Sequence, residues 1–308
     1  MENRFDLDGH WGPARLFAEA GLGDPRQVRD WCMGVGLLRG QSVCRRHREL
    51  RTLRERSGRD GSFWYCRKCD KQVAITKDSI FEDANLPPAK LVMLALSYAH
   101  GDSYVSTARN CIFSREDGLV PNSTIARWFE YFREIVLEKC LSSGLEHGGM
   151  VGGPGVVVQI DEAQIGRRKY NRGRVYEDTW VFGAIDDHGK LRLEICDKRN
   201  KVTLHSLVQK HVHPGSVIHS DSWKAYNGLD KLGYAHSTVN HSKEFVAEDG
   251  THTQRIEAQW RAVRRYFCPG GRRHANMADY LVEYMWRRKC LVEGTDPFKS
   301  LIMMLKSE

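Results

Sequence analysis

Short apolar runs in the second half of the chain predict β-strands. They are rich in β-branched and aromatic residues, as buried strands usually are. The runs cover residues 156–160 (VVVQI), 179–186 (TWVFGAID), 190–197 (KLRLEICD) and 216–221 (SVIHSD). A helical pattern at 202–212 separates the third run from the fourth, and helices are expected from about Thr253 and Ala275. Three strands, a helix, a strand and closing helices indicate an α/β domain with a mixed sheet.

The first half of the chain predicts helices instead. Asp24-Pro25 is typical of an N-cap followed by proline at the first helical position, and Pro87-Pro88 precedes the apolar stretch AKLVMLALSYAH. A further helix is expected to begin near Asn122 or Ser123. Its apolar residues recur close to a period of 3.6 and predict a buried face formed by Ile125, Trp128, Phe132, Ile135 and Cys140.

Composition limits the class of protein. The 308 residues are 41% hydrophobic with a mean hydropathy of −0.52, which excludes a disordered tail. No apolar stretch approaches the roughly 20 residues that a bilayer requires. The N-terminal sequence MENRFDLDGH has neither a basic nor an apolar signal-peptide region, and nine cysteines, an odd number, argue against a disulfide scaffold. We therefore expect a protein of a reducing compartment that is neither secreted nor bound to a membrane.

Positive charge is concentrated in one segment. The chain holds 47 Lys and Arg against 39 Asp and Glu, a formal net charge of +8. Residues 39–77 alone hold 12 basic and 4 acidic side chains, so their net charge is also +8 and the rest of the chain balances to zero. A local excess of this size predicts a polyanionic partner for that segment.

Four potential zinc ligands lie inside the basic segment. Cys44-x2-His47 and Cys66-x2-Cys69 are two ligand pairs separated by 18 residues. Each pair can bind one side of a tetrahedral zinc ion, and a module of this size would depend on the metal for much of its folding free energy. We therefore predict one structural Zn²⁺ bound by Cys44, His47, Cys66 and Cys69, with Cys32 as an alternative to His47.

Arginine side chains surround these ligands. Arginine binds phosphate oxygens well, so a small zinc ribbon that holds DNA by its backbone is the favoured interpretation. A solvated basic face or a nuclear-import signal is the alternative. Neighbouring Phe63, Trp64 and Tyr65 would either pack under the ribbon or stack on bases. The candidate DNA contacts are Arg45, Arg46, Arg48, Arg51, Arg67 and Lys68.

Three carboxylates occupy positions that suit metal-dependent phosphoryl transfer. Asp161 follows the run VVVQI, Asp221 ends the run SVIHSD, and Glu257 lies on a predicted helix. Two Mg²⁺ or Mn²⁺ ions require oxygen ligands of this kind. On the helix, an apolar stripe of Ile256, Trp260, Val263 and Phe267 lies beside a face that holds Glu257 and three candidate DNA contacts, Arg261, Arg264 and Arg265.

Several longer motifs carry a family resemblance. VVVQIDEAQIGRRKYNRGR, WVFGAID, SVIHSDSWKAY, HSTVNHSKEFV and THTQRIEAQW occur in this order between about Val156 and Cys290. Together they resemble Merlin-type DNA transposases and the related bacterial insertion-sequence transposases, and the upstream CRKC is similar to that family's zinc ribbon. Bacterial relatives commonly carry cysteine in both ligand pairs, whereas the first pair here is Cys44 and His47.

The resemblance implies a DDE transposase with an RNase H-like mixed sheet and flanking helices. Asp161, Asp221 and Glu257 match the catalytic triad, which would bind two Mg²⁺ or Mn²⁺ ions. The implied partners are double-stranded DNA, as terminal inverted repeats and target DNA, and a second copy of the chain in a homodimer or higher assembly. Localisation would be nuclear in a eukaryotic host and otherwise cytoplasmic or in the nucleoid. The alternatives are a domesticated zinc-ribbon DNA-binding protein without transposition and an RNase H-like nuclease or resolvase.

The expected domain organisation follows from these features. Residues 144–155 contain six glycines and one proline and are typical of a linker. The predicted parts are N-terminal helices (1–38), a zinc ribbon (39–80), a helical region with a possible helix-turn-helix (81–143), the linker (144–155), the catalytic domain (156–293) and a C-terminal tail (294–308). Within the helical region, residues 123–139 are one candidate recognition helix.

Some residues keep open interpretations. Arg167, Arg168 and Lys169 follow the first acid and are candidate DNA contacts in a hairpin or insertion. The roles of His219, His241 and His252 are not decided by the sequence.

Overall fold

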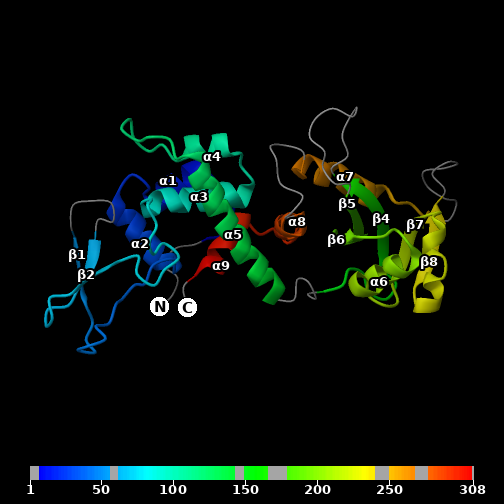
Figure 1. Cartoon of the computed structure of the whole chain (residues 1–308), viewed down its shortest axis with the longest axis horizontal. Coiled ribbons are helices and arrows are strands. Elements are labelled where there is room, and N and C mark those ends of the chain that lie inside the picture. The colour runs from blue at the N-terminus through cyan, green and yellow to red at the C-terminus, as the bar shows by residue number, and fades with distance from the viewer. Residues whose placement is uncertain are drawn as a thin grey trace. The chain divides into compact units, whose positions relative to one another are not determined.

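The chain divides into two compact units. The computed structural model describes residues 7–55, 62–142, 149–165, 179–239, 250–267 and 277–306. One unit comprises residues 1–136 together with 294–308, and the other comprises residues 137–293 (Figure 1). Within the described ranges, no helix has both the length and the apolar character that a bilayer span requires.

The first unit is built around one buried helix. Helix α3 (Pro88–His100) is inaccessible along residues 91–99, because other helices of the unit pack on several of its sides. Gly101, with a φ of 74°, ends it in a left-handed cap. The surrounding helices are α1 (Pro13–Ala20), α2 (Pro25–Val35), α4 (Tyr104–Asn110), α5 (Asn122–Ser142), which ends in the second unit, and α9 (Pro297–Leu305).

The predicted C-terminal tail is a helix in the structure. Asp296 caps α9 by accepting a hydrogen bond from the Phe298 backbone N–H at 2.8 Å, and it also accepts one from the Trp11 N–H at 2.9 Å. Phe298 is fully buried, with its ring 5.5 Å from that of Trp11 and 6.4 Å from that of Trp31. Helix α9 therefore completes the core of the first unit, because Phe298, Leu301, Ile302 and Leu305 are buried there.

The buried face of α5 differs from the prediction in two positions. Phe129 and Val136 are buried, whereas Trp128 and Ile135 are only half-buried. A period of 3.6 falls between adjacent residues at these points, so the sequence pattern alone does not distinguish them.

The basic segment contains a small antiparallel sheet. Strands β1 (Thr52–Glu55), β2 (Ser62–Tyr65) and β3 (Gln72–Ala74) pair in the order β1-β2-β3. Phe63 and Trp64 on β2 are both buried, and as consecutive strand residues they face opposite sides of this small sheet.

The second unit contains a five-stranded mixed sheet, which confirms the α/β prediction. Its order is β6-β5-β4-β7-β8, with antiparallel pairing from β6 to β4 and parallel pairing from β4 to β8. The strands are β4 (Val157–Ile165), β5 (Thr179–Asp186), β6 (Leu191–Cys196), β7 (Val217–Asp221) and β8 (Ala235–Val239). The last of these has no counterpart among the apolar runs of the sequence, since its side chains are mostly polar.

Helices and short 3₁₀ turns cover both faces of this sheet. On one face lie α6 (Lys201–His211), η2 (Lys224–Tyr226) and η3 (Leu229–Leu232), which pack on Val158, Ile160 and Ile218. On the other face lie α7 (Gln254–Phe267) and α8 (Met277–Val292), which pack on Ala163 and Val181. Strand β4 therefore lies at the centre of a three-layer unit (Figure 1).

Part of the predicted linker belongs to the second unit. Val151 is fully buried and forms a β-bridge with Val212, and the backbone N–H groups of Gly152 and Gly153 donate to Asp186 and Ser216. The glycines serve close packing here as well as chain reversal: Gly152 has a φ of 83°, and a Cβ at that position would lie 2.4 Å from the Ser216 Oγ.

The role of α9 can be tested by truncating its buried aromatic residue. We expect Phe298→Ala to lower the free energy of unfolding of the first unit by about 3–5 kcal/mol, because it leaves a cavity between Trp11 and Trp31. Urea unfolding followed by tryptophan fluorescence measures the loss. Met303→Ala is the matched control on the same helix, since Met303 is 51% exposed, and should cost less than about 0.5 kcal/mol. Equal effects of the two substitutions would show that α9 is not part of the core.

Candidate active site

The two aspartates of the predicted triad lie on neighbouring parallel strands. Gln159 on β4 pairs with His219 on β7, and Asp161 and Asp221 each follow two residues later. Side chains alternate along a strand, so both acids share the sheet face of Gln159 and His219. Asp221 also accepts a hydrogen bond from the Trp223 backbone N–H at 3.1 Å, which orients its carboxylate.

Asp161 is held by two donors in a poorly hydrated position. The Glu162 backbone N–H donates to its Oδ1 and the Trp260 indole N–H donates to its Oδ2, both at 2.8 Å. Burial, reinforced by the negative charges of Glu162 and Asp221, raises the pKa of Asp161 to about 7 despite these hydrogen bonds. A cation beside Asp161 would offset this unfavourable charge.

A glycine makes room for the indole. Gly183 on β5 pairs with Asp161, and a Cβ at this position would lie 2.6 Å from Trp260 and 2.9 Å from Ile256. Glycine inside a strand often marks such a close approach. Gly183 therefore allows α7 to lie close enough to the sheet for Trp260 to reach Asp161.

Glu257 lies in the first turn of α7 and lines a cavity of about 650 Å³ together with Asp161. The Thr253 hydroxyl donates to its Oε1 at 2.8 Å. Arg261 and Arg264 line the same cavity, whereas Arg265 is exposed and does not line it. The predicted apolar stripe of α7 is confirmed, since Ile256, Trp260 and Val263 are buried and Phe267 packs beside them.

The three acids share one region without closing around one point. Within the described ranges, two groups of three or more potential ligands lie within 4.8 Å of one another, and the three acids form neither of them. The second group contains His10, His100 and Asp296. Its imidazole rings stack with planes only 13° apart, so their in-plane nitrogen lone pairs do not converge on a common point.

A buried polar cluster beneath the aspartates was missed by the sequence reasoning. Glu162, which is 8% exposed, accepts hydrogen bonds from the Arg199 Nε and Nη2 at 3.2 and 3.1 Å and from the Tyr226 hydroxyl. The Arg199 guanidinium lies 3.9 Å from the Trp180 ring centre and 3.6 Å from that of Trp223. The only sequence signal was the acid pair Asp161-Glu162, because Arg199 joins the cluster through the fold.

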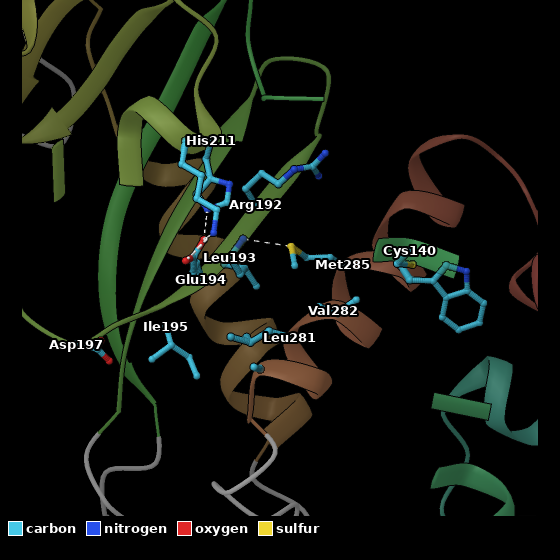
Figure 2. Close-up of a pocket in the computed structure, with 13 residues that line it drawn as sticks. Cys140, Arg192, Leu193, Glu194, Ile195, Asp197, His211, Leu281, Val282 and Met285 are labelled. Atoms are coloured by element: carbon cyan, nitrogen blue, oxygen red, sulfur yellow. Dashed lines mark hydrogen bonds and ion pairs between the residues drawn. The ribbon is translucent and has the colours of Figure 1, made fainter. Parts of the chain in front are cut away.

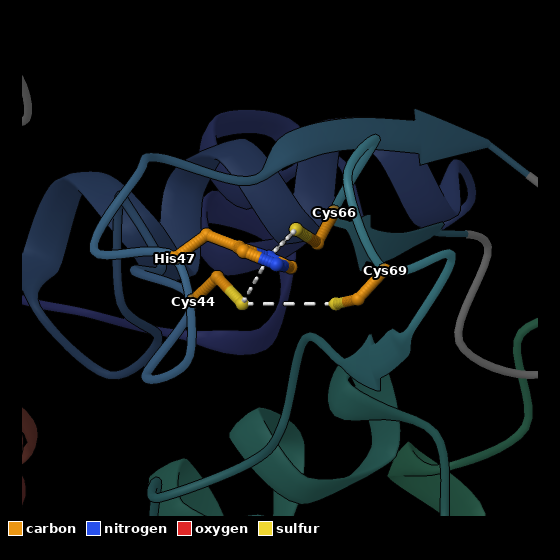
Figure 3. Close-up of side chains that lie close together, drawn as sticks. All are labelled: Cys44, His47, Cys66 and Cys69. Atoms are coloured by element: carbon orange, nitrogen blue, oxygen red, sulfur yellow. Dashed lines mark hydrogen bonds between the residues drawn. The ribbon is translucent and has the colours of Figure 1, made fainter.

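Four of the predicted zinc ligands come together in the first unit (Figure 3). The Sγ of Cys44 lies 3.7 Å from the Nδ1 of His47 and 3.8 Å from the Sγ of Cys69, and the Sγ of Cys66 lies 3.5 Å from the same nitrogen. Backbone N–H groups, led by that of His47, lower the pKa of Cys44 to about 6 and favour the thiolate. Cys32 is instead fully buried in α2, and burial raises its pKa strongly.

Two matching turns present these ligands. The Cys44 carbonyl accepts from the Arg48 N–H and the Cys66 carbonyl from the Asp70 N–H. Arg48 and Asp70, each four residues after the first cysteine of its pair, have left-handed backbone conformations, with φ of 53° and 57°. The two halves of the cluster thus have the same local geometry, although one pair ends in histidine and the other in cysteine.

A basic groove of about 900 Å³ adjoins this cluster. Arg45, Arg46 and Arg51 line it, as predicted DNA contacts. Three further cations that the sequence did not single out also line it: Arg39, Lys71 and Lys77. Arg48, Arg67 and Lys68 are exposed but do not line the groove, and Lys68 forms an ion pair with Glu49 at 2.5 Å. Arg167, Arg168, Lys169 and His241 lie outside the described residues.

A third cavity, of about 410 Å³, lies between β6 and α8 (Figure 2). Leu193, Leu281 and Met285 line it, and the Met285 sulfur accepts from the Leu193 N–H at 3.2 Å. Glu194 at this cavity has its pKa lowered to about 2 by His211, with a further contribution from Lys210. Because its carboxylate is already paired, this cavity does not resemble the open acidic site at Asp161.

The buried position of Asp161 predicts a pH-dependent cost. Because its pKa is higher in the folded than in the unfolded chain, the folded state binds more protons, and stability falls as pH rises from about 4 to 7. Asp161→Asn mimics the protonated form. In metal-free buffer, the unfolding free energy of this variant relative to the wild type should therefore rise by on the order of 2 kcal/mol as pH increases from about 5 to 8. Denaturant unfolding at both pH values measures this, and a difference between variant and wild type that does not change with pH would contradict it.

The clearest similarity to known proteins lies in the second unit. Residues 150–289 match the ISXO2-like transposase domain. An uncharacterized transposase-like protein of Haemophilus influenzae is 29% identical over 105 residues, which cover 34% of this chain and 80% of that protein.

Solved structures show a much weaker likeness. A pre-cleavage Mos1 transpososome aligns at 10% identity and a TM-score of 0.28, covering 71% of this chain and 97% of that chain. A Mos1 transposase paired-end complex aligns at 11% identity and a TM-score of 0.27, covering 70% and 78%. Scores this low do not define a shared fold. The ISXO2-like match, which includes Asp161, Asp221 and Glu257, supports a DDE transposase.

Proposed function

We propose that this chain is a Merlin-type DNA transposase that binds terminal inverted repeats and moves its element by cut-and-paste strand cleavage and 3′-end transfer. One observation carries the proposal: Asp161 within β4 and Asp221 at the end of β7 lie on one face of two neighbouring parallel strands, and Glu257 lines a cavity with Asp161. The sheet, with three antiparallel strands followed by two parallel ones, suits an RNase H-like catalytic domain.

The donors at this face suit hard divalent cations. Asp161, Asp221 and Glu257 offer carboxylate oxygens, the ligands that Mg²⁺ and Mn²⁺ prefer, and the raised pKa of Asp161 marks negative charge without full compensation. When bound, such ions activate the attacking oxygen and stabilise the leaving oxygen.

The chain's own residues position the acids and the DNA. Trp260 fixes one oxygen of Asp161, and Thr253 holds Glu257 on the first turn of α7. Arg261 and Arg264 line the same cavity and can bind the phosphates that flank the reacting one. There, a water or 3′-hydroxyl oxygen forms a new P–O bond as the bond to the leaving 3′-oxygen breaks.

The first unit supplies DNA binding in this proposal. The cluster of Cys44, His47, Cys66 and Cys69 has the donor types and spacing for one tetrahedral zinc ion. Cations along the adjacent groove would contact the DNA backbone, and α4 and α5 are candidate helix-turn-helix elements. Pairing of two element ends requires a dimer or higher assembly.

The catalytic proposal can be tested with the DNA that flanks the coding sequence. We expect purified protein to cleave a duplex carrying the flanking inverted repeats in Mg²⁺ and to join its 3′ ends to a target duplex. Asp161→Asn, Asp221→Asn or Glu257→Gln should each reduce cleavage at least about 100-fold while end binding persists. Asp230→Asn is the matched control.

The outcomes separate the alternatives. Cleavage without end joining would favour a nuclease or resolvase. Binding of the ends without cleavage by the wild type would favour a domesticated DNA-binding protein. A variant of any of the three acids that cuts at the wild-type rate would remove that residue from the site.

The zinc proposal has a matched pair of cysteines for its test. Metal analysis of the purified protein should find about one zinc per chain, and Cys66→Ser or His47→Ala should lose it because each removes one of four ligands. Cys32→Ala should retain the metal, since Cys32 is a fully buried residue of α2 outside the four-ligand cluster. Loss of zinc in Cys32→Ala but not in His47→Ala would assign the fourth ligand to Cys32, and zinc-independent stability would contradict a structural site.

A further inference from the structure

The buried side chain of Gln159 links the sheet to the start of α7. Gln159 is fully inaccessible on β4, two residues before Asp161. Its Oε1 accepts hydrogen bonds from the backbone N–H groups of Arg255 at 2.8 Å and Ile256 at 3.2 Å. These groups lie in the first turn of α7, where backbone donors have no partner within the helix. A strand residue therefore caps the helix that carries Glu257.

The usual capping side chain is engaged elsewhere. Thr253 precedes α7, and its carbonyl accepts from the Glu257 N–H at 3.1 Å. Its hydroxyl donates to the Glu257 carboxylate, so that contact orients the acid. Gln159 and Thr253 thus divide two tasks, fixing the helix to the sheet and orienting its acid.

The same capping contact determines which way the Gln159 amide points. Backbone N–H groups only donate, so the oxygen of the amide must face α7. The amide nitrogen then faces the Nδ1 of His252 at 3.1 Å. An NH₂ group also only donates, so this Nδ1 must accept and cannot carry a proton. The proton of the neutral ring therefore resides on Nε2.

His252 lies on the face that bears the acids. Its ring is 6.3 Å from that of His219, which pairs with Gln159 and precedes Asp221 by two residues. Within the described part of the chain, His252 has a hydrogen bond to Gln159 through Nδ1 and a ring contact with His219. The Nε2–H is thus left available as a donor beside the acidic site.

We propose that His252, held in its Nε2–H form by Gln159, donates a hydrogen bond to an oxygen of the reacting phosphate in the DNA strand bound at the three acids. Gln159 is the positioning residue for both His252 and α7. A neutral donor suits this place, because it binds a phosphate oxygen without repelling divalent cations held by the nearby carboxylates. This inference rests on the proposed transposase function.

Nuclear magnetic resonance tests the tautomer without any DNA. In ¹⁵N-histidine-labelled protein, long-range ¹H–¹⁵N correlations should show His252 with its proton on Nε2, the signals being assigned by their loss in His252→Gln. Gln159→Glu keeps an oxygen for α7 but places an acceptor against Nδ1, so the proton should move to Nδ1. A proton on Nδ1 in the wild type would overturn the proposal, whether or not the Gln159→Glu variant folds.

Single-turnover cleavage of the inverted-repeat duplex tests the role. His252→Leu should slow cleavage by about 10- to 100-fold while end binding in Ca²⁺ stays unchanged, as expected for a donor that acts on the reacting phosphate. His252→Gln, whose amide can place an N–H near the position of Nε2, should recover part of the rate, which a merely structural role would not allow. A His252→Leu enzyme that cuts at the wild-type rate would overturn the proposal.

The two proposals fail differently. If Asp161→Asn abolishes cleavage and His252→Leu does not, the transposase function stands and the role of His252 is refuted. If the wild type does not cleave, the transposase function fails, and the role of His252 in contacting DNA fails with it. The tautomer measurement then decides only whether Gln159 positions His252.

Discussion

The second unit depends on how its central strand satisfies buried polar side chains. Strand β4 is paired on both sides, yet it carries Gln159, Asp161 and Glu162 in or near the core. Burying such groups is costly unless each finds partners. Gln159 accepts hydrogen bonds from the start of α7, Asp161 accepts one from Trp260, and Glu162 accepts one from Arg199. These partners therefore fix the positions of the helix and the loops around the site.

The two faces of β4 therefore have different tasks. On one face, Asp161 retains a raised pKa and an open cavity, which are useful properties for a group that binds cations. On the other face, Arg199 compensates Glu162 and stacks between Trp180 and Trp223. Arg199 contacts the ring of Trp223, and the backbone N–H of Trp223 donates to Asp221. The ion pair between Arg199 and Glu162 therefore helps to position the second acid.

The basic segment of the first unit has few buried apolar side chains. It has only short strands, and its four ligand side chains lie on two turns of matching geometry. A metal bound there would tie the strands together and keep Arg45, Arg46 and Arg51 along one groove. The helical part instead obtains its core from both ends of the chain, through Trp11 and Phe298.

The sequence by itself predicted most of the elements and named the residues of the candidate sites. Strand composition located β4 to β7, and the spacing of Cys44, His47, Cys66 and Cys69 identified the cluster, because these signals are local. Similarly, Asp161, Asp221 and Glu257 were identified from the motifs around them. By contrast, the polar strand β8 and the exact buried face of α5 were not predicted, since neither follows from local apolar spacing alone.

Only the tertiary structure decided which distant side chains meet. It paired Glu162 with Arg199, placed Trp260 over Gly183, returned α9 to the first unit and capped α7 with Gln159. Each contact joins residues far apart in the sequence, and the contacts of Glu162 and Gln159 satisfy polar groups that folding removes from water. Such partners depend on strand register and helix placement, which side-chain periodicity along one segment does not specify.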